Sequence, residues 1–423
     1  MTQPLQPPVK PPSAGGGSGP GPKRPGAKSV TIPDLARSLQ EGARRLEAQF
    51  LGKEEIIRLL FISAVAGEHM VMVGPPGTAK SALVRAFADT IDASYYDYLL
   101  TRFTEPNEIF GPVDIQAFRQ GNYRRRIEGM LPEAEIAFMD EIFKANSAIL
   151  NSLLGVLNSR RFSHGNTTIS VPLISMFAAS NEVPNDDALS ALFDRFLLRA
   201  RVEYLDSYQF RGLLQKGAAL EAASLADQAS GGANKPKAMI GARELVAVQS
   251  QFGRLLQAMD EEFLATYKGL VFQIRSEGIN LSDRRVVKML KLFAASAVFD
   301  GREQVNDADF FILRHVWNTP EQQDILQEIV GPILDAWYEQ HPEQQRIGAT
   351  PTSLQDLLSE LRIIRETLAS AEVLSDMQLF SQLRNLGDIK AALQRMKDNP
   401  AAERMIGEVD KLLETMFASS RFV

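Results

Sequence analysis

The sequence predicts an α/β fold in which helices cover a parallel sheet, followed by segments that are helical throughout. Three observations lead to this expectation. Short apolar runs alternate with helical patterns between residues 33 and 206, a glycine-rich loop joins the first run to a helix, and helical spacing dominates from about residue 207. Continuous apolar runs are typical of parallel strands buried on both faces, and their alternation with helices indicates βαβ units.

Five strands are expected to form one parallel sheet. The runs that predict them are Met70–Val73, Tyr95–Leu99, Ile136–Met139, Leu173–Ala179 and Leu197–Val202. Two helices are expected before the first strand, and their patterns cover Asp34–Phe50 and Lys53–Gly67.

The length of 423 residues suggests more than one domain. Residues 1–30 are rich in Pro and Gly and carry basic but no acidic side chains, so we expect a disordered tail. Residues 31–206 form the predicted α/β domain, residues 207–320 a helical domain, and residues 321–423 a helical C-terminal extension. A Gly- and Ala-rich stretch at 229–236 is expected to be an exposed loop.

The C-terminal extension contains an apolar seam at three- and four-residue steps, made of Leu354, Leu357, Leu361, Ile364 and Leu368. Because the seam is short and interrupted, we expect it to pack within the chain. Asn399-Pro400 is typical of a helix start, and it predicts a last helix that ends near Met416.

Composition narrows the classes of function. A net charge of −6 argues against a nucleic-acid partner, which would need a basic face. The chain has no cysteine, and its four histidines lie far apart, so neither a disulfide framework nor a zinc site is expected. The N-terminus lacks the apolar stretch of a signal peptide, and no apolar run reaches the ~18 residues of a membrane span. We therefore expect no membrane insertion and a cytoplasmic location.

A phosphate-binding loop is the strongest functional signal. It follows the strand Met70–Val73, opens the helix expected at Ser81–Thr90, and consists of Gly74, Pro75, Pro76, Gly77, Thr78, Ala79, Lys80 and Ser81. In such a loop the backbone N–H groups and the helix N-terminus surround the phosphates. Lys80 is expected to reach the β- and γ-phosphates of ATP, and the Ser81 hydroxyl to bind Mg²⁺. Ala79 stands where the motif usually has its second glycine.

An acidic pair follows the strand Ile136–Met139. Ligands of open α/β sheets bind beyond the carboxyl ends of the strands, where this pair lies. Asp140 fits the carboxylate on the Mg²⁺ side, and Glu141 fits the residue that polarises the attacking water. Asn181, after the strand Leu173–Ala179, either orients water near the γ-phosphate or simply forms a turn.

With these elements in order, the chain resembles the AAA+ superfamily and, more narrowly, the MoxR family and its RavA-like branch. The resemblance covers residues 33–320. The segments that carry it are Gly74–Ser81, Leu100–Pro112, Leu131–Glu135, Asp140–Ala145, Ala179–Glu182, Leu192–Arg195 and Ser282–Arg285. The family commonly has alanine before the loop lysine, so Ala79 agrees with it. The C-terminal hundred residues match the family poorly.

The resemblance implies a hexameric, Mg²⁺-dependent ATPase with a helical lid. Asn181 would be sensor 1 and Arg195 the arginine finger, which reaches the neighbouring subunit's γ-phosphate. Arg284 would be sensor 2, with Arg285 as the alternative. Arg199 and Arg201 are rival fingers, although their place in a strand favours a structural role. A partner with a von Willebrand factor A (VWA) domain is implied by analogy.

Two β-hairpins are predicted, and they fit insertions that face the pore in related rings. The first covers Ile115–Arg126 with a turn at Gln120–Asn122, and the second covers Phe162–Val171 with a turn at His164–Asn166. The side chains that could touch a threaded substrate are Phe118, Tyr123, Arg124, Arg125 and Arg126. The three arginines could equally be a solvated face.

The leading functional expectation is chaperone-like remodelling of a protein partner, driven by ATP. Three alternatives stay open: a metal-insertion motor of the magnesium chelatase type, a DNA translocase that uses the arginines of the first hairpin, and a nucleotide-gated scaffold. Glu141 argues against the scaffold, which would need no residue to activate water.

Overall fold

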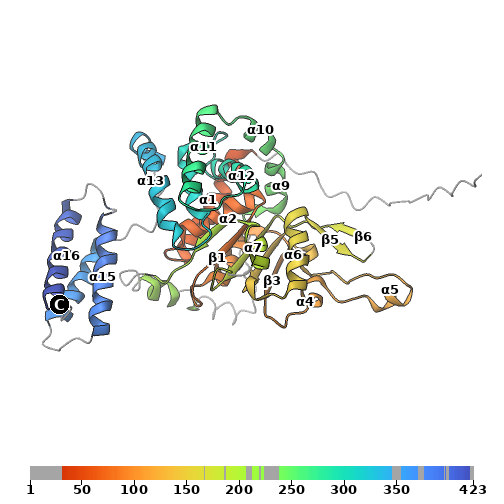
Figure 1. Ribbon diagram of the computed structural model, residues 1–423, viewed down its shortest axis with the longest axis horizontal. Coiled ribbons are helices and arrows are strands. Elements are labelled where there is room, and N and C mark those ends of the chain that lie inside the picture. The colour runs from red at the N-terminus through yellow and green to blue at the C-terminus, as the bar shows by residue number, and fades with distance from the viewer. Residues whose placement is uncertain are drawn as a thin grey trace, which may run out of the picture.

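A five-stranded parallel sheet lies at the centre of the α/β region (Figure 1). The computed structural model describes residues 31–165, 167–184, 187–205, 212–218, 221–222, 238–344, 354–369, 376–394, 396 and 400–419. The predicted tail at 1–30, the predicted loop at 229–236 and the helix start at Asn399 lie outside the described residues.

The sheet has the order β3-β4-β7-β1-β8, and every neighbouring pair is parallel. Its strands are β1 (His69–Val73), β3 (Tyr95–Leu99), β4 (Ile136–Asp140), β7 (Ser175–Ser180) and β8 (Phe196–Arg201). All five predicted strands are present, and their bounds shift by at most two residues. This confirms the α/β fold with a five-stranded parallel sheet.

Strand β3 departs from the pattern of a strand buried on both faces. Its five residues are half-buried or exposed, whereas β1 is buried throughout. β3 forms one edge of the sheet, where Asp97 forms an ion pair with Arg85 at 2.6 Å. The expectation of a continuous apolar run is therefore wrong for this strand, because Asp97 interrupts it. An edge position alone does not expose a strand, since β8 at the other edge is buried at five of its six residues.

Helices cover both faces of the sheet (Figure 1). They are α1 (Ile32–Gln49), α2 (Glu54–Ala66), α3 (Lys80–Thr90), α6 (Ser147–Ser159) and α7 (Asp187–Phe193), with the short turns α4 (Pro106–Phe110), η1 (Leu131–Glu133) and η2 (Ile142–Lys144) between them. The α2 helix is buried along most of its length, and it packs against α1, β1 and α12. It ends at Gly67, which has the left-handed backbone (φ 65°) typical of a helix C-terminus.

Only one of the two predicted hairpins forms. β5 (Arg161–His164) pairs with β6 (Thr167–Ser170) in an antiparallel ladder, as predicted. The first hairpin is wrong, because α5 (Ile115–Arg119) replaces its first strand and a single bridge joins Val113 to Arg125. The Asp114 carboxylate accepts hydrogen bonds from the backbone N–H groups of Gln116 and Ala117, and this N-cap favours a helical turn. We call residues 112–126 the α5 lobe.

The second region is almost entirely helical. It contains α9 (Ala242–Gln249), α10 (Phe252–Gln257), α11 (Glu261–Ser276), α12 (Asp283–Phe299), η4 (Asp307–His315), α13 (Gln322–Gln340) and η5 (Pro342–Gln344). One strand corrects the all-helical expectation: β9 (Ile240–Gly241) pairs in parallel with β2 (Ile91–Asp92). This pairing ties the start of the helical region to the end of α3.

Within the C-terminal extension, the described residues from 354 onward form a three-helix unit with a core of its own, whereas α13 packs against η4. Its helices are α14 (Leu354–Ala369), α15 (Asp376–Gln394) and α16 (Pro400–Ser419). The buried seam residues Leu357, Leu361 and Ile364 pack against apolar side chains of α15 and α16. The seam therefore packs within the chain, as predicted. None of the helices in the described part of the chain is long and apolar enough to cross a membrane.

Candidate active site

The glycine-rich loop runs from β1 to α3 at the carboxyl edge of the sheet. A Cβ atom on Gly74 would lie 1.9 Å from the carbonyl oxygen of Val202, so a side chain cannot fit there. The Gly74 N–H donates to the carbonyl of Ser180 at 3.1 Å. Gly77 has a φ of +80°, which L-residues rarely adopt. Gly74 thus has a steric reason to be glycine, and Gly77 a conformational one.

Ala79 adopts a left-handed backbone with φ 62° and forms the N-cap of α3. This conformation costs an L-residue roughly 1–2 kcal/mol. Alanine also has no side-chain oxygen with which to cap the helix. The first N–H groups of α3 are therefore available to an anion at the helix N-terminus.

Lys80 lies folded over the loop. Its Nζ donates to the carbonyls of Gly74 at 2.7 Å and Pro75 at 2.8 Å. Burial lowers the pKa of Lys80, and the nearby carboxylates of Asp140 and Glu141 oppose that shift. The lysine is thus placed between the loop and the acidic pair.

Asp140 and Ser81 lie within hydrogen-bonding distance. The Ser81 Oγ donates to Asp140 Oδ2 at 2.7 Å, while Asp140 Oδ1 accepts from the N–H of Glu141 at 3.0 Å. The loop after β3 is fixed here too, because the N–H of Leu100 donates to the Asp140 carbonyl at 2.9 Å. A hydroxyl and a carboxylate are the hard oxygen donors that Mg²⁺ prefers, so this pair fits the ion.

Glu141 and Asn181 meet because they follow neighbouring strands. Asn181 Nδ2 donates a hydrogen bond to Glu141 Oε1. Glu141 has a left-handed backbone with φ 52°, a strained conformation that directs its side chain. Lys144 completes the group with an Nζ 3.3 Å from Glu141 Oε2. The sequence interpretation brought Glu141 and Asn181 to this edge but missed Lys144.

Arg195 and Arg284 lie close to each other. Burial lowers the pKa of Arg195, and the neighbouring charge of Arg284 adds to this shift while Asp194 opposes it. Arg195 pairs with Asp194 at 3.2 Å, and Arg284 donates to Asn158 Oδ1 at 2.9 Å. Within the described residues, no hydrogen bond or ion pair joins either arginine to residues 74–81.

Arg285 and Arg199 are buried, and each is about 1% exposed. Arg285 donates to the Val316 carbonyl at 2.9 Å, and burial lowers its pKa to about 10 although Asp194 opposes the shift. Arg199 donates to Asn318 Oδ1 at 2.6 Å, and its guanidinium lies 3.8 Å from the centre of the Phe193 ring. These contacts support a structural role for both.

The remaining candidate, Arg201, pairs with Glu203 at 2.5 Å.

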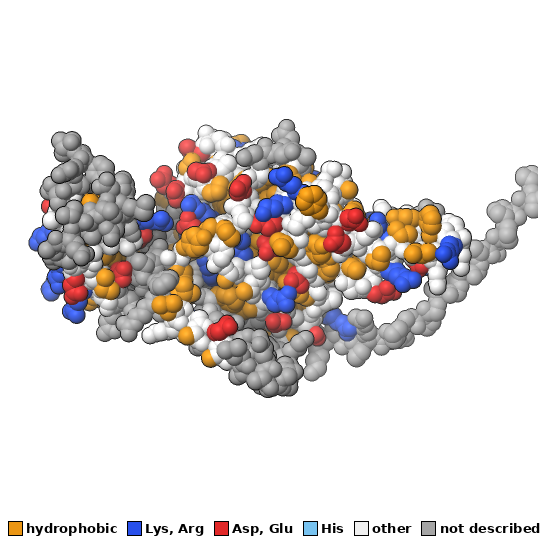
Figure 2. All heavy atoms as spheres, turned by 90° about the horizontal axis from the view of Figure 1, so that it is seen from below, with side chains coloured by type: hydrophobic (Ala, Val, Ile, Leu, Met, Phe, Trp, Pro, Cys, Tyr) orange, Lys and Arg blue, Asp and Glu red, His pale blue; other side chains and the backbone are white. Residues whose placement is uncertain are grey.

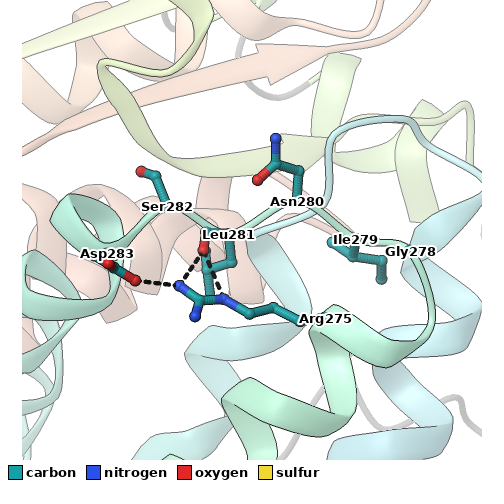
Figure 3. Close-up of a pocket in the computed structure, with 7 residues that line it drawn as sticks. All are labelled: Arg275, Gly278, Ile279, Asn280, Leu281, Ser282 and Asp283. Carbon is teal, nitrogen blue, oxygen red and sulfur yellow. Dashed lines mark hydrogen bonds and ion pairs between the residues drawn. The ribbon is translucent and has the colours of Figure 1, made fainter.

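The segment that leads into α12 is fixed by a residue the sequence interpretation missed (Figure 3). Arg275 donates to the Leu281 carbonyl through Nε at 2.9 Å and NH2 at 2.6 Å, and NH2 also reaches Asp283 Oδ1 at 2.6 Å. A cavity of about 580 Å³ lies beside this segment. These bonds tie α11 to the segment that precedes α12, the helix that carries Arg284.

Comparisons with known proteins agree with this architecture. Residues 37–239 match the family described as the MoxR domain in the MoxR-vWA-beta-propeller ternary systems, and residues 262–330 match an AAA lid domain. A protein of uncharacterised function from Methanocaldococcus jannaschii is 34% identical over 382 residues, which cover 88% of this chain and 96% of the relative.

Two further proteins are similar to this chain, one in sequence and one in structure. The chaperone MoxR1 of Mycobacterium tuberculosis is 24% identical over 183 residues, covering 42% of this chain and 48% of the relative. A crystal structure of an ATPase candidate from Cytophaga hutchinsonii superposes with a TM-score of 0.53 at 19% identity, covering 72% of this chain and 96% of the other. The latter shows the fold alone.

The parallel sheet, the phosphate-binding loop and the helical lid define an AAA+ ATPase. Within that class, the chain belongs to the MoxR family.

Proposed function

We propose that this chain works as a hexameric ring in the cytoplasm, where Mg²⁺-dependent ATP hydrolysis remodels a protein partner that acts with a VWA-domain protein. The observation that carries this proposal is the meeting of Lys80, Ser81, Asp140, Glu141 and Asn181 at one edge of the sheet. The RavA-like branch is part of this proposal. The description of the matched family names vWA and beta-propeller systems and does not name that branch.

The phosphates of ATP would lie against the backbone N–H groups of residues 77–81, with Lys80 neutralising their charge. Ser81 and Asp140 would hold Mg²⁺, which supplies charge stabilisation for the phosphates when bound. Glu141 would orient the attacking water, and Asn181 would keep that carboxylate in place. Each of these roles follows from donor chemistry and position at the carboxyl edge of the sheet.

The arginines support a composite site between subunits. Arg195 and Arg284 lie together, and within the described residues neither contacts the loop of its own chain. We propose that both reach a neighbour's nucleotide, with Arg195 as the finger and Arg284 as sensor 2. Arg285 is the weaker candidate for sensor 2, because its buried guanidinium already bonds the Val316 carbonyl.

The partner is proposed from chemistry and from relatives. The matched family is described by its vWA and beta-propeller systems, and one relative is named a chaperone. The α5 lobe carries exposed apolar side chains, with Phe118 61% and Tyr123 40% exposed, which suits contact with a polypeptide. Figure 2 shows apolar side chains spread over the visible face, some of them on the right-hand lobe of the molecule. The proposed partners are therefore a VWA-domain protein and a polypeptide client, without nucleic acid.

Replacing Glu141 with Gln tests this function. Loss of a positioned base should slow phosphate release roughly 10²–10⁴-fold while ATP binding persists. The ATP-loaded variant is then a trap, and we expect it to retain a recombinant VWA-domain protein on an affinity column more strongly than ADP-loaded wild type. Release of phosphate at the wild-type rate would remove Glu141 from its role, and equal retention in both states would contradict ATP-driven partner binding.

A further inference from the structure

Both carboxylate oxygens of Glu141 are engaged by groups of its own chain. Oε1 accepts the hydrogen bond from Asn181, and Oε2 faces the Lys144 ammonium at 3.3 Å. The two partners differ in setting. Asn181 belongs to the strand-end loop of the central sheet, whereas the side chain of Lys144 is 56% exposed and that of Glu141 only 16% exposed.

Backbone geometry sets the Lys144 contact. Glu141 is the N-cap of η2, and the Lys144 N–H donates to the Glu141 carbonyl at 2.8 Å. In a 3₁₀ turn the side chains at i and i+3 lie over each other, so the lysine is placed above the carboxylate. Ile142 anchors the turn because it is fully buried, and Asn146 fixes its far side by donating to the Thr104 carbonyl at 2.7 Å.

The ion pair competes with the proposed work of Glu141. A carboxylate that orients water needs a lone pair directed at that water. An ammonium at 3.3 Å draws Oε2 towards itself instead. Because the lysine is exposed, water and salt screen the pair, and such pairs are weak enough to open and close during turnover.

We propose that Lys144 is a positioning residue that restrains Glu141, and that opening of the Lys144–Glu141 ion pair is a step in reaching the hydrolytic geometry. This inference rests on the proposed role of Glu141 in orienting water. It assigns Lys144 a restraining effect on basal turnover, rather than a contact with the reacting atoms.

Replacing Lys144 with Gln tests the restraint. We expect kcat of the basal ATPase to rise by about 1.5- to 5-fold at low salt, the range that exposed ion pairs are worth, with KM for ATP unchanged. Lys144→Arg keeps the cation and should return kcat to the wild-type value. Lys268→Gln, at an exposed lysine of α11, controls for the loss of one surface charge.

The dependence of kcat on salt concentration distinguishes the restraint from a purely structural role of Lys144, which would leave that dependence unchanged. Between about 0.05 and about 0.3 M NaCl, screening should raise wild-type kcat towards that of Lys144→Gln, while the variant stays flat. Light scattering checks that both keep the same assembly state across the series. An unchanged or lower kcat in Lys144→Gln, or parallel salt curves, would overturn the restraint.

The Glu141→Gln variant separates the two levels of the proposal. If it is inactive and Lys144→Gln behaves like wild type, only the restraint fails. If Glu141→Gln hydrolyses ATP normally, the role of Glu141 fails first, and the inference fails with it.

Discussion

Two residues of the site hold left-handed backbone conformations without being glycine. Ala79 ends the phosphate loop with φ 62°, and Glu141 follows β4 with φ 52°. Such conformations cost of order 1–3 kcal/mol each and persist where the surroundings determine them. Ala79 leaves the first N–H groups of α3 without a side-chain cap. The backbone of Glu141 directs its carboxylate to Asn181. Local strain and site geometry thus come from the same two positions.

The metal pair gives a prediction at the residue scale. Ser81→Ala removes one of the two oxygen donors that lie 2.7 Å apart. We expect the Mg²⁺ concentration for half-maximal ATPase to rise at least about tenfold. Loss of a group that only orients a metal ligand already lowers metal affinity by about tenfold or more, and loss of the ligand itself should cost at least as much. Asp140→Asn should have a larger effect, and excess EDTA should abolish wild-type hydrolysis. Ser159→Ala on α6, which removes an exposed hydroxyl, is the control. A Mg²⁺ titration of Ser81→Ala that coincides with wild type would contradict the assignment.

The sequence predicted the position of those site residues that directly follow a recognisable strand. The loop and the acidic pair each follow a buried strand, so their edge of the sheet could be expected before the structure. Lys144 could not, because its contact depends on the left-handed backbone of Glu141. The choice between Arg284 and Arg285 also needed the phase of α12, which buries the second of the two consecutive arginines. Arg275 gave no signal, since its partner at Asp283 lies across a turn.

At the scale of elements, the α5 lobe shows why a turn signal alone is a weak predictor of a hairpin. Residues around Gly121 turn the chain as expected, but the Asp114 carboxylate caps a helix before the turn. The lobe nevertheless meets the β5–β6 hairpin. A Cβ atom on Gly165 would lie 1.6 Å from the Tyr123 carbonyl oxygen, so the two insertions touch backbone to backbone.

This contact predicts different effects for two glycine substitutions. Gly165 and Gly121 both have positive φ (+67° and +80°), but no atom lies within 4 Å of the position a Cβ would take on Gly121. Either change to Ala should cost about 1–2 kcal/mol of local backbone strain. Only Gly165→Ala should also part the insertions and raise amide exchange in both the α5 lobe and the β5–β6 hairpin. Equal exchange in the two variants would mean that the insertions do not depend on each other.

At the scale of the whole chain, the lid is joined to the α/β domain by buried charge. Glu68, which is 3% exposed, lies between α2 and β1 and accepts from Lys288 at 2.7 Å and Lys291 at 2.8 Å. Both lysines belong to α12, the helix that also carries Arg284. Because the Glu68 carboxylate is buried, removing its lysine partners would leave a buried charge unpaired, so α12 and the sheet should move as one body. Arg284 on α12 then keeps a fixed position relative to the phosphate-binding loop of its own chain. Within the described residues neither Arg284 nor Arg195 bonds that loop, which supports the proposed site between subunits.

A mixture of two inactive variants tests that composite site. Arg195→Ala should bind ATP yet lose about 10³–10⁵ in rate, because the finger in trans is missing. Glu141→Gln should also bind ATP but fail to hydrolyse it, because it lacks the carboxylate that orients the water. An interface in which an Arg195→Ala subunit holds the nucleotide and a Glu141→Gln subunit offers its intact arginine contains every part. Steady-state ATPase should therefore reappear on mixing with subunit exchange and peak at intermediate ratios.

Linked dimers decide what a negative result means. If exchange is demonstrated and the mixture stays inactive, either Arg195 does not act in trans or the ring tolerates no inactive subunit. Covalent dimers that carry one defect in each half, built in both orders, alternate the two defects around the ring. One order places the complete interface within each pair, and the other places it between neighbouring pairs. In either order every second interface of the ring is complete, so activity no longer depends on the random assembly of two variants. Because a finger in trans needs only the correct neighbour, at least one order should hydrolyse ATP; inactivity of both, with ATP binding retained, would contradict a site shared between subunits.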